Sequence, residues 1–323
     1  MDYQLLDFGN GRKLERFGEF ILDRPAPAVQ AYKKNRPKLW SQAHSKFFRE
    51  KDLKGKWVDR VPFPSSWNVC INGLTFSLKR TPVGHLGVFV EQADNWNWLT
   101  SVTKPDMKVL NLFAYTGGSS IAPALANESV VVSHVDSAAN TVQWAKVNGQ
   151  LTEQATGKKL SIRWLTEDAE RFVLRELKRG NFYDAFILDP PSYGHGAKGE
   201  IWKIADALPR LLDECMELTN GAPEYALLTA HTPEFPTEEL ARLLELRLPG
   251  GYRFESGAMR PYSVDLPPMP CGAAWSGSPG TRSTGKRAFS TAICSALLWW
   301  IPAPAGRSAP SPLWRSCPRD SCM

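Results

Sequence analysis

The segment Asp189-Pro190-Pro191-Ser192-Tyr193 carries the sharpest chemical signal in this sequence of 323 residues. It follows the short apolar run at residues 185–188, which predicts a buried strand. Two prolines at the end of a strand fix a rigid turn and leave no N–H group to be satisfied. The turn is therefore expected to present the Asp189 carboxylate and the Pro190 carbonyl as hydrogen-bond acceptors. Such a cluster can orient an amino group or a base edge for in-line attack on a methyl donor.

A turn rich in small residues, residues 111–119, forms a second candidate site. Small residues let a ligand approach the backbone, and the helix predicted from Ser119 or Ser120 offers free N–H groups at its start. Ala114 lies in this turn, and its methyl group is tolerable if its φ stays negative. Alone this turn is weak evidence, because any tight strand-to-helix turn can have this composition.

Two acidic residues follow the next two predicted strands. Asp136 comes about twenty positions after the glycines, where a carboxylate is suited to accept hydrogen bonds from ribose hydroxyls. Asp168 follows the third strand and could lie near an adenine amino group. The alternative role for each is a helix N-cap, and at Asp168 both roles can coexist.

These candidate residues fall at regular places because strand, turn and helix alternate from Lys108 onward. The predicted strands are residues 109–113, 130–135, 161–165, 185–188, 225–229 and 252–259. This alternation predicts an α/β fold with a mostly parallel sheet and helices on both faces. Ligands of such folds bind beyond the carboxyl ends of the strands, which is where the candidate residues lie.

The chain is predicted to have three parts: a small β-rich N-terminal domain at residues 1–85, the α/β domain at residues 86–260, and an atypical tail at residues 261–323. Gly9-Asn10-Gly11 and Asn72-Gly73 predict hairpin turns in the first part. Its basic and aromatic stretch, residues 32–40, could track an RNA backbone and stack a base. The alternative is a solvated face with Trp40 packed inward.

The tail has an unusual composition. Residues 262–323 hold nine Pro, ten Ser, four Trp and four Cys, and they carry +4 of the net charge of +6. A charge-based case for nucleic acid binding therefore rests mainly on the tail. We interpret the tail as disordered or read out of frame, with an interaction tail as the alternative. On this interpretation the last strand of the sheet could be lost, which would expose the sixth strand as an edge.

In order and spacing, these candidate residues resemble the class I S-adenosylmethionine-dependent methyltransferases, and within them the large-subunit branch of 23S ribosomal RNA methyltransferases. The resemblance covers residues 87–259 and includes residues 87–92. It implies a Rossmann-like, seven-stranded methyltransferase sheet and S-adenosylmethionine (SAM) as the cofactor.

The resemblance also implies a role for each candidate residue. Asp136 would bind the ribose and Asp168 the adenine, and Gln92 would lie in a segment that covers the cofactor. The methionine end of the cofactor would be lined by Phe113, Ala114, Tyr115, Thr116, Gly117 and Gly118. The methyl-transfer site would be formed by Asp189, Pro190, Pro191 and Tyr193.

Some relatives methylate carbon 5 of cytosine through a cysteine after the fifth strand or in the proline motif. Here those positions read Thr229-Ala230-His231-Thr232 and Asp189-Pro190-Pro191-Ser192. Direct transfer to a base nitrogen is therefore favoured, with positioning supplying most of the rate. His195 and His231 could act as bases, but a lone histidine is more often structural.

The segment after the proline motif, residues 194–203, is predicted to be a mobile basic loop. It could close over a nucleotide, with Tyr193 or Trp202 stacking and Lys198 on a phosphate. The alternative is an ordinary surface loop with Trp202 anchored in the core.

The sequence therefore favours a cytoplasmic SAM-dependent methyltransferase whose partner is RNA, most plausibly ribosomal RNA, with no metal and no membrane segment. A non-catalytic RNA-binding protein that keeps this fold is the alternative. A nicotinamide-dependent dehydrogenase is disfavoured because the G-x-G-x-x-G spacing is absent.

Overall fold

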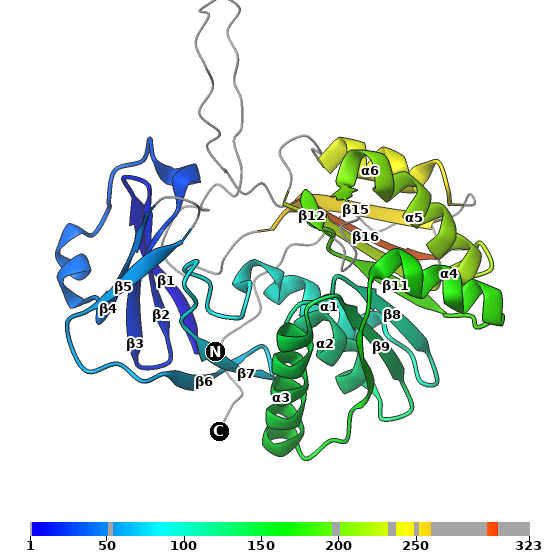
Figure 1. Ribbon diagram of the computed structural model, residues 1–323, viewed down its shortest axis with the longest axis horizontal. Helices are drawn as coiled ribbons and strands as arrows, with labels where there is room; N and C mark the ends of the chain where they lie inside the picture. Colours follow the sequence, from blue (N-terminus) through cyan, green and yellow to red (C-terminus); the bar gives the residue numbers. More distant parts are fainter. Residues whose placement is uncertain are drawn as a thin grey trace, which may run out of the picture.

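The computed structural model describes residues 2–50, 54–195, 201–231, 237–248, 252–259 and 296–302. An N-terminal sheet lies beside a larger α/β unit (Figure 1). None of the helices in these ranges is long and apolar enough to cross a membrane.

The N-terminal sheet has five strands in the order in which they occur in the chain. They are β1 (Tyr3–Gly9), β2 (Arg12–Phe17), β3 (Phe20–Pro25), β4 (Ser45–Arg49) and β5 (Gly55–Asp59). The pair β3 and β4 is parallel and the other pairs are antiparallel. A separate hairpin follows, made of β6 (Ser66–Ile71) and β7 (Leu74–Lys79).

Both predicted hairpin turns are confirmed. Asn10 and Gly11 have φ values of 52° and 70°, and Asn72 and Gly73 have φ values of 50° and 80°. A type I′ turn needs positive φ at both central positions, which asparagine and glycine adopt most easily.

The basic stretch between β3 and β4 contains the 3-10 helices Pro27–Val29 and Pro37–Gln42. Trp40 donates from Nε1 to Asp7 Oδ2 at 2.7 Å, and the Lys34 ammonium lies 3.5 Å from the centre of its ring. Trp40 is therefore held by protein groups but is half-buried, and both interpretations of this basic stretch stay predictions.

The α/β unit has a seven-stranded sheet in the order β10-β9-β8-β11-β14-β16-β15. The strands are β8 (Lys108–Leu112), β9 (Val131–Asp136), β10 (Ser161–Thr166), β11 (Ala185–Leu188), β14 (Tyr225–Ala230), β15 (Tyr252–Ala258) and β16 (Ala296–Pro302). The first five strands of that order are parallel, and β16 runs antiparallel to both of its neighbours. The predicted Rossmann-like class is confirmed.

Helices cover both faces of this sheet (Figure 1). They are α1 (Ala93–Val102), α2 (Gly118–Ala126), α3 (Ala139–Thr156), α4 (Ala169–Arg179), α5 (Ile204–Leu218) and α6 (Thr237–Glu245). Alternation along the strands separates two cores. Val109 and Ile187 pack with α1 and α2, whereas Leu110 and Phe186 pack with α4 and α5.

The last strand of the sheet, which could be lost on our interpretation of the tail, is present. Residues Ala296–Pro302 form β16 between β14 and β15, with Leu298 opposite Leu228 and Ser256. The other tail residues lie outside the described ranges, so the interpretation of the tail as disordered or out of frame, and the boundaries of the three parts, stay predictions.

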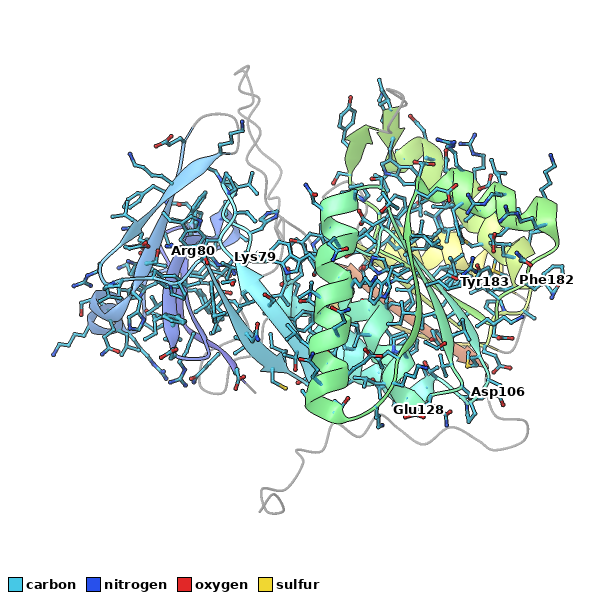
Figure 2. The ribbon with its side chains drawn as sticks, turned by 60° about the horizontal axis from the view of Figure 1, so that its bottom comes forward. Lys79, Arg80, Asp106, Glu128, Phe182 and Tyr183 are labelled. Atoms are coloured by element: carbon cyan, nitrogen blue, oxygen red, sulfur yellow. The ribbon has the colours of Figure 1, made fainter. Side chains whose placement is uncertain are left out.

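The N-terminal sheet and the α/β unit are joined through β7. Its backbone is bound by α3, where the Asn148 amide oxygen accepts from Ser77 N at 2.9 Å and Trp144 Nε1 donates to Ser77 O at 2.6 Å. Arg80 lies just after β7 (Figure 2). It pairs with Asp59 at the end of β5.

Candidate functional site

The turn between β8 and α2 has an unusual backbone. Phe113 and Tyr115 have positive φ values of 55° and 48°, and Gly117 caps α2 with a φ of 92°. Ala114, between the first two, is not among the residues with positive φ. Ala114 therefore does not need the positive φ that favours glycine, as the sequence analysis required for an alanine at this position.

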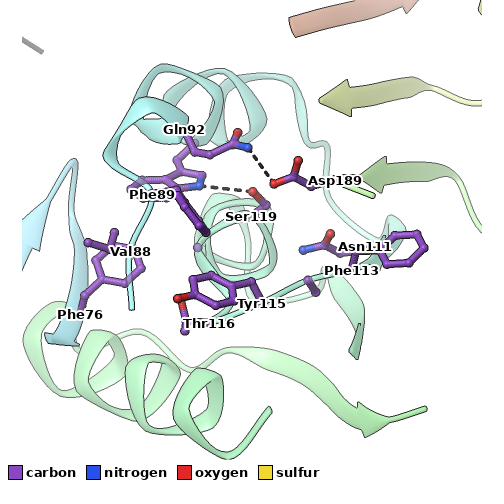
Figure 3. Close-up of a pocket in the computed structure, with 14 residues that line it drawn as sticks. Phe76, Val88, Phe89, Gln92, Asn111, Phe113, Tyr115, Thr116, Ser119 and Asp189 are labelled. Carbon is purple, nitrogen blue, oxygen red and sulfur yellow. Dashed lines mark hydrogen bonds between the residues drawn. The ribbon is translucent and has the colours of Figure 1, made fainter. Parts of the chain in front are cut away.

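This turn forms the wall of a cleft of about 380 Å³. The cleft lies among α1, the β8–α2 turn and the end of β11 (Figure 3). It is lined by Phe76, Val88, Phe89, Gln92, Trp96, Asn111, Phe113, Ala114, Tyr115, Thr116, Gly117, Gly118, Ser119 and Asp189.

Close contacts fix the wall of the cleft. Thr116 Oγ1 donates to Gly87 O at 2.7 Å, and Trp96 Nε1 donates to Ser119 Oγ at 3.3 Å (Figure 3). A Cβ atom on Gly118 would lie 2.6 Å from Cζ2 of Trp96, so only glycine fits there without a shift of the ring.

Asp136 ends β9 and ties the β8–α2 turn to the start of α3. Its Oδ2 accepts from Tyr115 N and its Oδ1 from Ala138 N, both at 2.9 Å. Ala138, and not Asp136, is the N-cap residue of α3, so the N-cap alternative for Asp136 is wrong. Desolvation raises the pKa of Asp136, although both backbone hydrogen bonds oppose this change.

Asp168 is the N-cap of α4, where its Oδ1 accepts from Arg171 N at 3.0 Å. It lines a different cleft, between α4, α5 and β13 (Ile201–Lys203). The ring centres of Phe113 and Trp202 lie 4.9 Å apart. Phe113 lines the first cleft and Trp202 lines the second, so the two clefts meet at these rings. The capping role is therefore seen, and the adenine role stays a prediction.

Asp189 lies at the mouth of the first cleft and is bound by Gln92, which also contacts side chains of β14 and α1. Its Oδ2 accepts from Gln92 Nε2 at 3.1 Å (Figure 3), and the same nitrogen lies 3.3 Å from Thr229 Oγ1 at the end of β14. The Gln92 carbonyl in turn accepts from Asn95 Nδ2 at 2.5 Å. Gln92 is buried, and this network fixes the orientation of the Asp189 carboxylate.

His231 directly follows β14 and faces Asp189, with 3.6 Å between Nε2 and Asp189 Oδ1. Burial opposes ionisation of Asp189, but the His231 charge and the hydrogen bonds from Thr229 and Gln92 hold its pKa below the usual range. For His231, burial is outweighed by the Asp189 carboxylate, which raises the pKa of the imidazole. A structural role is the usual expectation for a lone histidine, but the structure places His231 beside the proline motif.

The other residues of the proline motif face different surroundings. Pro190 is buried, Pro191 is exposed, and the carbonyl of Pro191 accepts from Trp202 Nε1 at 2.7 Å. Tyr193 is exposed at 52% in the short strand β12 (Tyr193–His195), which pairs with β13. Trp202 is therefore anchored against protein groups, while Lys198 lies outside the described residues.

The described part of the chain contains two cysteines, Cys70 in the β6–β7 hairpin and Cys215 on α5. Neither lines the cleft. Burial raises the pKa of the Cys215 thiol, which disfavours the nucleophilic thiolate.

Six lining residues were not predicted as site residues: Phe76, Val88, Phe89, Trp96, Asn111 and Ser119. Asn111 and Ser119 belong to the turn that the sequence singled out. The apolar members carry no chemical signal, and Phe76 lies on β7, which was assigned to another domain.

Residues 26–246 match the protein family described as S-adenosylmethionine-dependent methyltransferase. Among curated proteins, Ribosomal RNA large subunit methyltransferase I of Tolumonas auensis is 28% identical over 169 residues, which are 52% of this chain and 41% of that protein. Ribosomal RNA large subunit methyltransferase K/L of Pseudoalteromonas atlantica is 32% identical over 127 residues, which are 39% of this chain and 17% of that protein. The chain therefore matches less than half the length of these relatives.

Among solved structures, the SAM-dependent methyltransferase from Agrobacterium tumefaciens is 30% identical, with a TM-score of 0.77. The likeness covers 94% of this chain and 91% of that chain. The structure of SMU.776 complexed with SAH (S-adenosylhomocysteine) is 14% identical, with a TM-score of 0.67, over 93% of this chain and 75% of that chain. This second likeness concerns the fold alone.

Proposed function

Since the chain belongs to the S-adenosylmethionine-dependent methyltransferases, we propose that it methylates a base of RNA, ribosomal RNA being favoured, at a nitrogen atom. The observation that carries this proposal is the Asp189 carboxylate, held by Gln92 at the mouth of a cleft whose wall is the β8–α2 turn.

The residues of the cleft fit SAM. The small residues of the β8–α2 turn let a ligand approach the backbone, and the N-terminus of α2 opens toward the cleft. We assign the methionine end of the cofactor to Phe113–Gly118 and its ribose to Asp136. Each Asp136 oxygen accepts one backbone N–H and retains a further acceptor site for a ribose hydroxyl.

Two further residues complete the proposed cofactor site. Gln92 covers the cleft from the side of α1, where its amide already binds Asp189. Asp168 receives the adenine at the point where Phe113 and Trp202 meet. Its Oδ2 is a second acceptor beside the one that caps α4.

SAM supplies an electrophilic methyl group on a positively charged sulfur. The chain's own residues orient the acceptor: Asp189 accepts a hydrogen bond from the N–H of the attacking base nitrogen and turns its lone pair toward the cleft. As the new N–C bond forms and the bond between the methyl carbon and the sulfur breaks, that nitrogen gives its proton to the Asp189 carboxylate, and SAH is the other product. Pro190 and Pro191 keep the turn rigid, and we assign the stacking on the base to Tyr193, whose ring is exposed.

A nitrogen target is favoured over carbon 5 because carbon-5 addition needs a cysteine nucleophile close to the target ring. In the described residues, the position after β14 is occupied by His231, and Cys70 and Cys215 lie elsewhere. An amine needs no such nucleophile, since its lone pair is available once its proton has an acceptor.

The RNA substrate is supported by the names of the curated relatives, which are ribosomal RNA methyltransferases. Because the match covers less than half of those proteins, the substrate is a proposal for this chain. Fold likeness alone does not identify a substrate.

Titration calorimetry with SAM, SAH and NADH tests the first step, and saturable binding of the first two alone is expected. Transfer of tritium from methyl-labelled SAM to purified ribosomal RNA, followed by nucleoside mass spectrometry, then tests the substrate. Label in an N-methylated nucleoside is the expected result. Label at carbon 5, or label in protein and none in RNA, would refute the proposal.

A further inference from the structure

A second cleft, of about 610 Å³, adjoins the cofactor cleft on the side of the N-terminal sheet. Val88 and Phe89 line both clefts. The other lining residues come from β2, β3 and β4 and from the segment that joins β7 to α1. They are Lys13, Arg24, Pro25, Phe47, Arg49, Val83, Gly84, His85, Val90 and Glu91.

Three cations from three neighbouring strands converge on this cleft: Lys13 from β2, Arg24 from β3 and Arg49 from β4. Glu15, which is completely buried, holds the first two in place. The Glu15 carboxylate lies 3.0 Å from Lys13 Nζ and 2.7 Å from Arg24 Nη2. Arg24 also donates from Nη1 to Gly84 O at 3.2 Å. These two cations are therefore fixed before any ligand arrives, while Arg49 is exposed and adjustable.

Positive charge exceeds negative charge among the described residues of this cleft. Glu15 is shared by two cations, and Glu91 is the acidic residue of the lining. The surplus is felt by His85, whose pKa is lowered to about 4 by desolvation and then by the charges of Arg24, Arg49 and Lys13. His85 is thus neutral at physiological pH and adds no charge to the cleft.

A row of rings leads from this cleft to the methyl-transfer site. The ring centre of His85 lies 5.6 Å from that of Phe89, and the ring of Phe89 lies 5.7 Å from that of His231. His231 in turn faces Asp189 at 3.6 Å. A ligand whose reacting group meets Asp189 can therefore extend over Phe89 to the three cations.

We propose that this cleft binds a backbone phosphate that flanks the target base of the RNA substrate, with Lys13, Arg24 and Arg49 as the phosphate-binding residues. The inference rests on the proposed RNA function and adds the place at which the strand is held. Arginine and lysine are the side chains that neutralise phosphates, and such contacts position a nucleic acid without reading its sequence. The ring of Phe89 lies where a base next to the target can stack.

Arg49→Gln tests the site with little risk to folding, because Arg49 is exposed at the end of β4. The matched control is Arg16→Gln. Arg16 is an exposed residue of β2 whose side chain lies on the opposite face of the strand from Lys13 and Glu15. Both variants remove one positive charge, so they change the net charge of the protein equally.

Fluorescence anisotropy measures binding of a labelled single-stranded RNA of mixed sequence, with SAH saturating, across a salt series. Loss of one phosphate contact reduces the slope of log affinity against log salt concentration by about 0.7. When the salt concentration rises fourfold, the affinity of Arg49→Gln for the RNA should therefore fall by a factor about 2.6 times smaller than the factor for the wild type. Arg16→Gln is expected to keep the wild-type slope. Equal slopes and affinities for the two variants would overturn the proposal.

Binding of pyrophosphate, measured by the broadening of its phosphorus NMR resonance, tests the anion site independently of the RNA substrate. If wild type binds pyrophosphate and Arg49→Gln does not, the anion site is supported even where the RNA shows no binding, and the RNA substrate alone is refuted. If wild type binds SAH but neither RNA nor pyrophosphate, the phosphate site is refuted as well.

Discussion

Replacing Gly118 with alanine should damage the cofactor cleft through a single side-chain collision. The added Cβ would lie 2.6 Å from Cζ2, 2.7 Å from Cε2 and 2.9 Å from Nε1 of Trp96. The Trp96 ring has little freedom to move. It is 3% exposed, its centre lies 5.0 Å from that of Phe76, and its Nε1 is bound to Ser119.

Two opposing effects set the size of the change. Overpacking of a fixed interior typically costs about 1–3 kcal/mol. Gly118 begins α2 and is not among the glycines with positive φ, so alanine should recover part of that cost, up to about 1 kcal/mol, through its higher helix propensity. We expect a net loss of about 1–2 kcal/mol, which lowers Tm by about 2–4 °C in a protein of this size.

The same collision should weaken cofactor binding, because the displaced Trp96 ring lines the cleft. We expect a dissociation constant for SAH that is higher by about tenfold, or about 1.4 kcal/mol. Thermal unfolding and titration calorimetry measure the two effects. Unchanged Tm and SAH affinity in Gly118→Ala would refute the reasoning.

A double-mutant cycle separates the collision from other causes. In a Trp96→Leu background the ring is gone, so Gly118→Ala should be neutral or slightly stabilising there. If Gly118→Ala is as harmful in that background as in the wild type, contact with Trp96 is not the reason for the damage.

Three further predictions concern the carboxylates of the site. Asp189→Asn should lower the methyl-transfer rate by about 100-fold or more while leaving SAH affinity nearly unchanged, because the proton acceptor is lost and the cofactor contacts remain; rates and calorimetry on the same preparation decide this, and parallel losses of both would contradict it. Asp136→Ala should lower Tm as well as SAH affinity, because the part-buried Tyr115 N loses its acceptor at a cost of about 1–3 kcal/mol, whereas the exposed Ala138 N can bind water instead. Asp136→Asn, compared by thermal unfolding, should lose less stability. The pair of Asp189 and His231 should also give a pH-dependent stability. Because the pKa of His231 is raised, its contribution to the free energy of unfolding is complete below pH 6.5 and is lost as the pH rises through the raised pKa. Because the pKa of Asp189 is lowered, its contribution is complete above pH 3.8 and is lost as the pH falls through the lowered pKa. Urea denaturation should therefore show a larger cost of Asp189→Asn near pH 5.5 than near pH 9, and equal costs would argue against the ion pair.

Much of the α/β sheet could be predicted from the sequence because its parallel strands are buried on both faces and appear as short apolar runs. The strand before Asp189 was predicted with the bounds that β11 has, and the strand before Asp136 was placed within one residue of β9. The hairpin turns were equally accessible, since Asn72-Gly73 encodes its own backbone shape.

The arrangement of the site was less accessible, because its contacts join residues far apart in the sequence. Gln92 and Asp189 are separated by 97 positions, and Thr229 by 137 positions from Gln92. His231 did carry a usable signal, since it is a polar residue directly after a buried strand, like Asp136 and Asp189. We judged it by residue type alone, and its pairing with Asp189 could not be read from local pattern.

The position of β16 inside the sheet has a consequence for synthesis on the ribosome. Leu228 of β14 pairs with Leu298 of β16, so about 70 further residues must be translated before the second neighbour of β14 has been synthesised. This translation takes about 4–14 s at ordinary elongation rates. During that interval β14 has β11 on one side and a row of unpaired backbone groups on the other. The nascent chain thus passes through a stage at which chaperones or the strands of another chain can bind this unpaired edge. The yield of folded protein should therefore depend on how quickly residues 296–302 are synthesised.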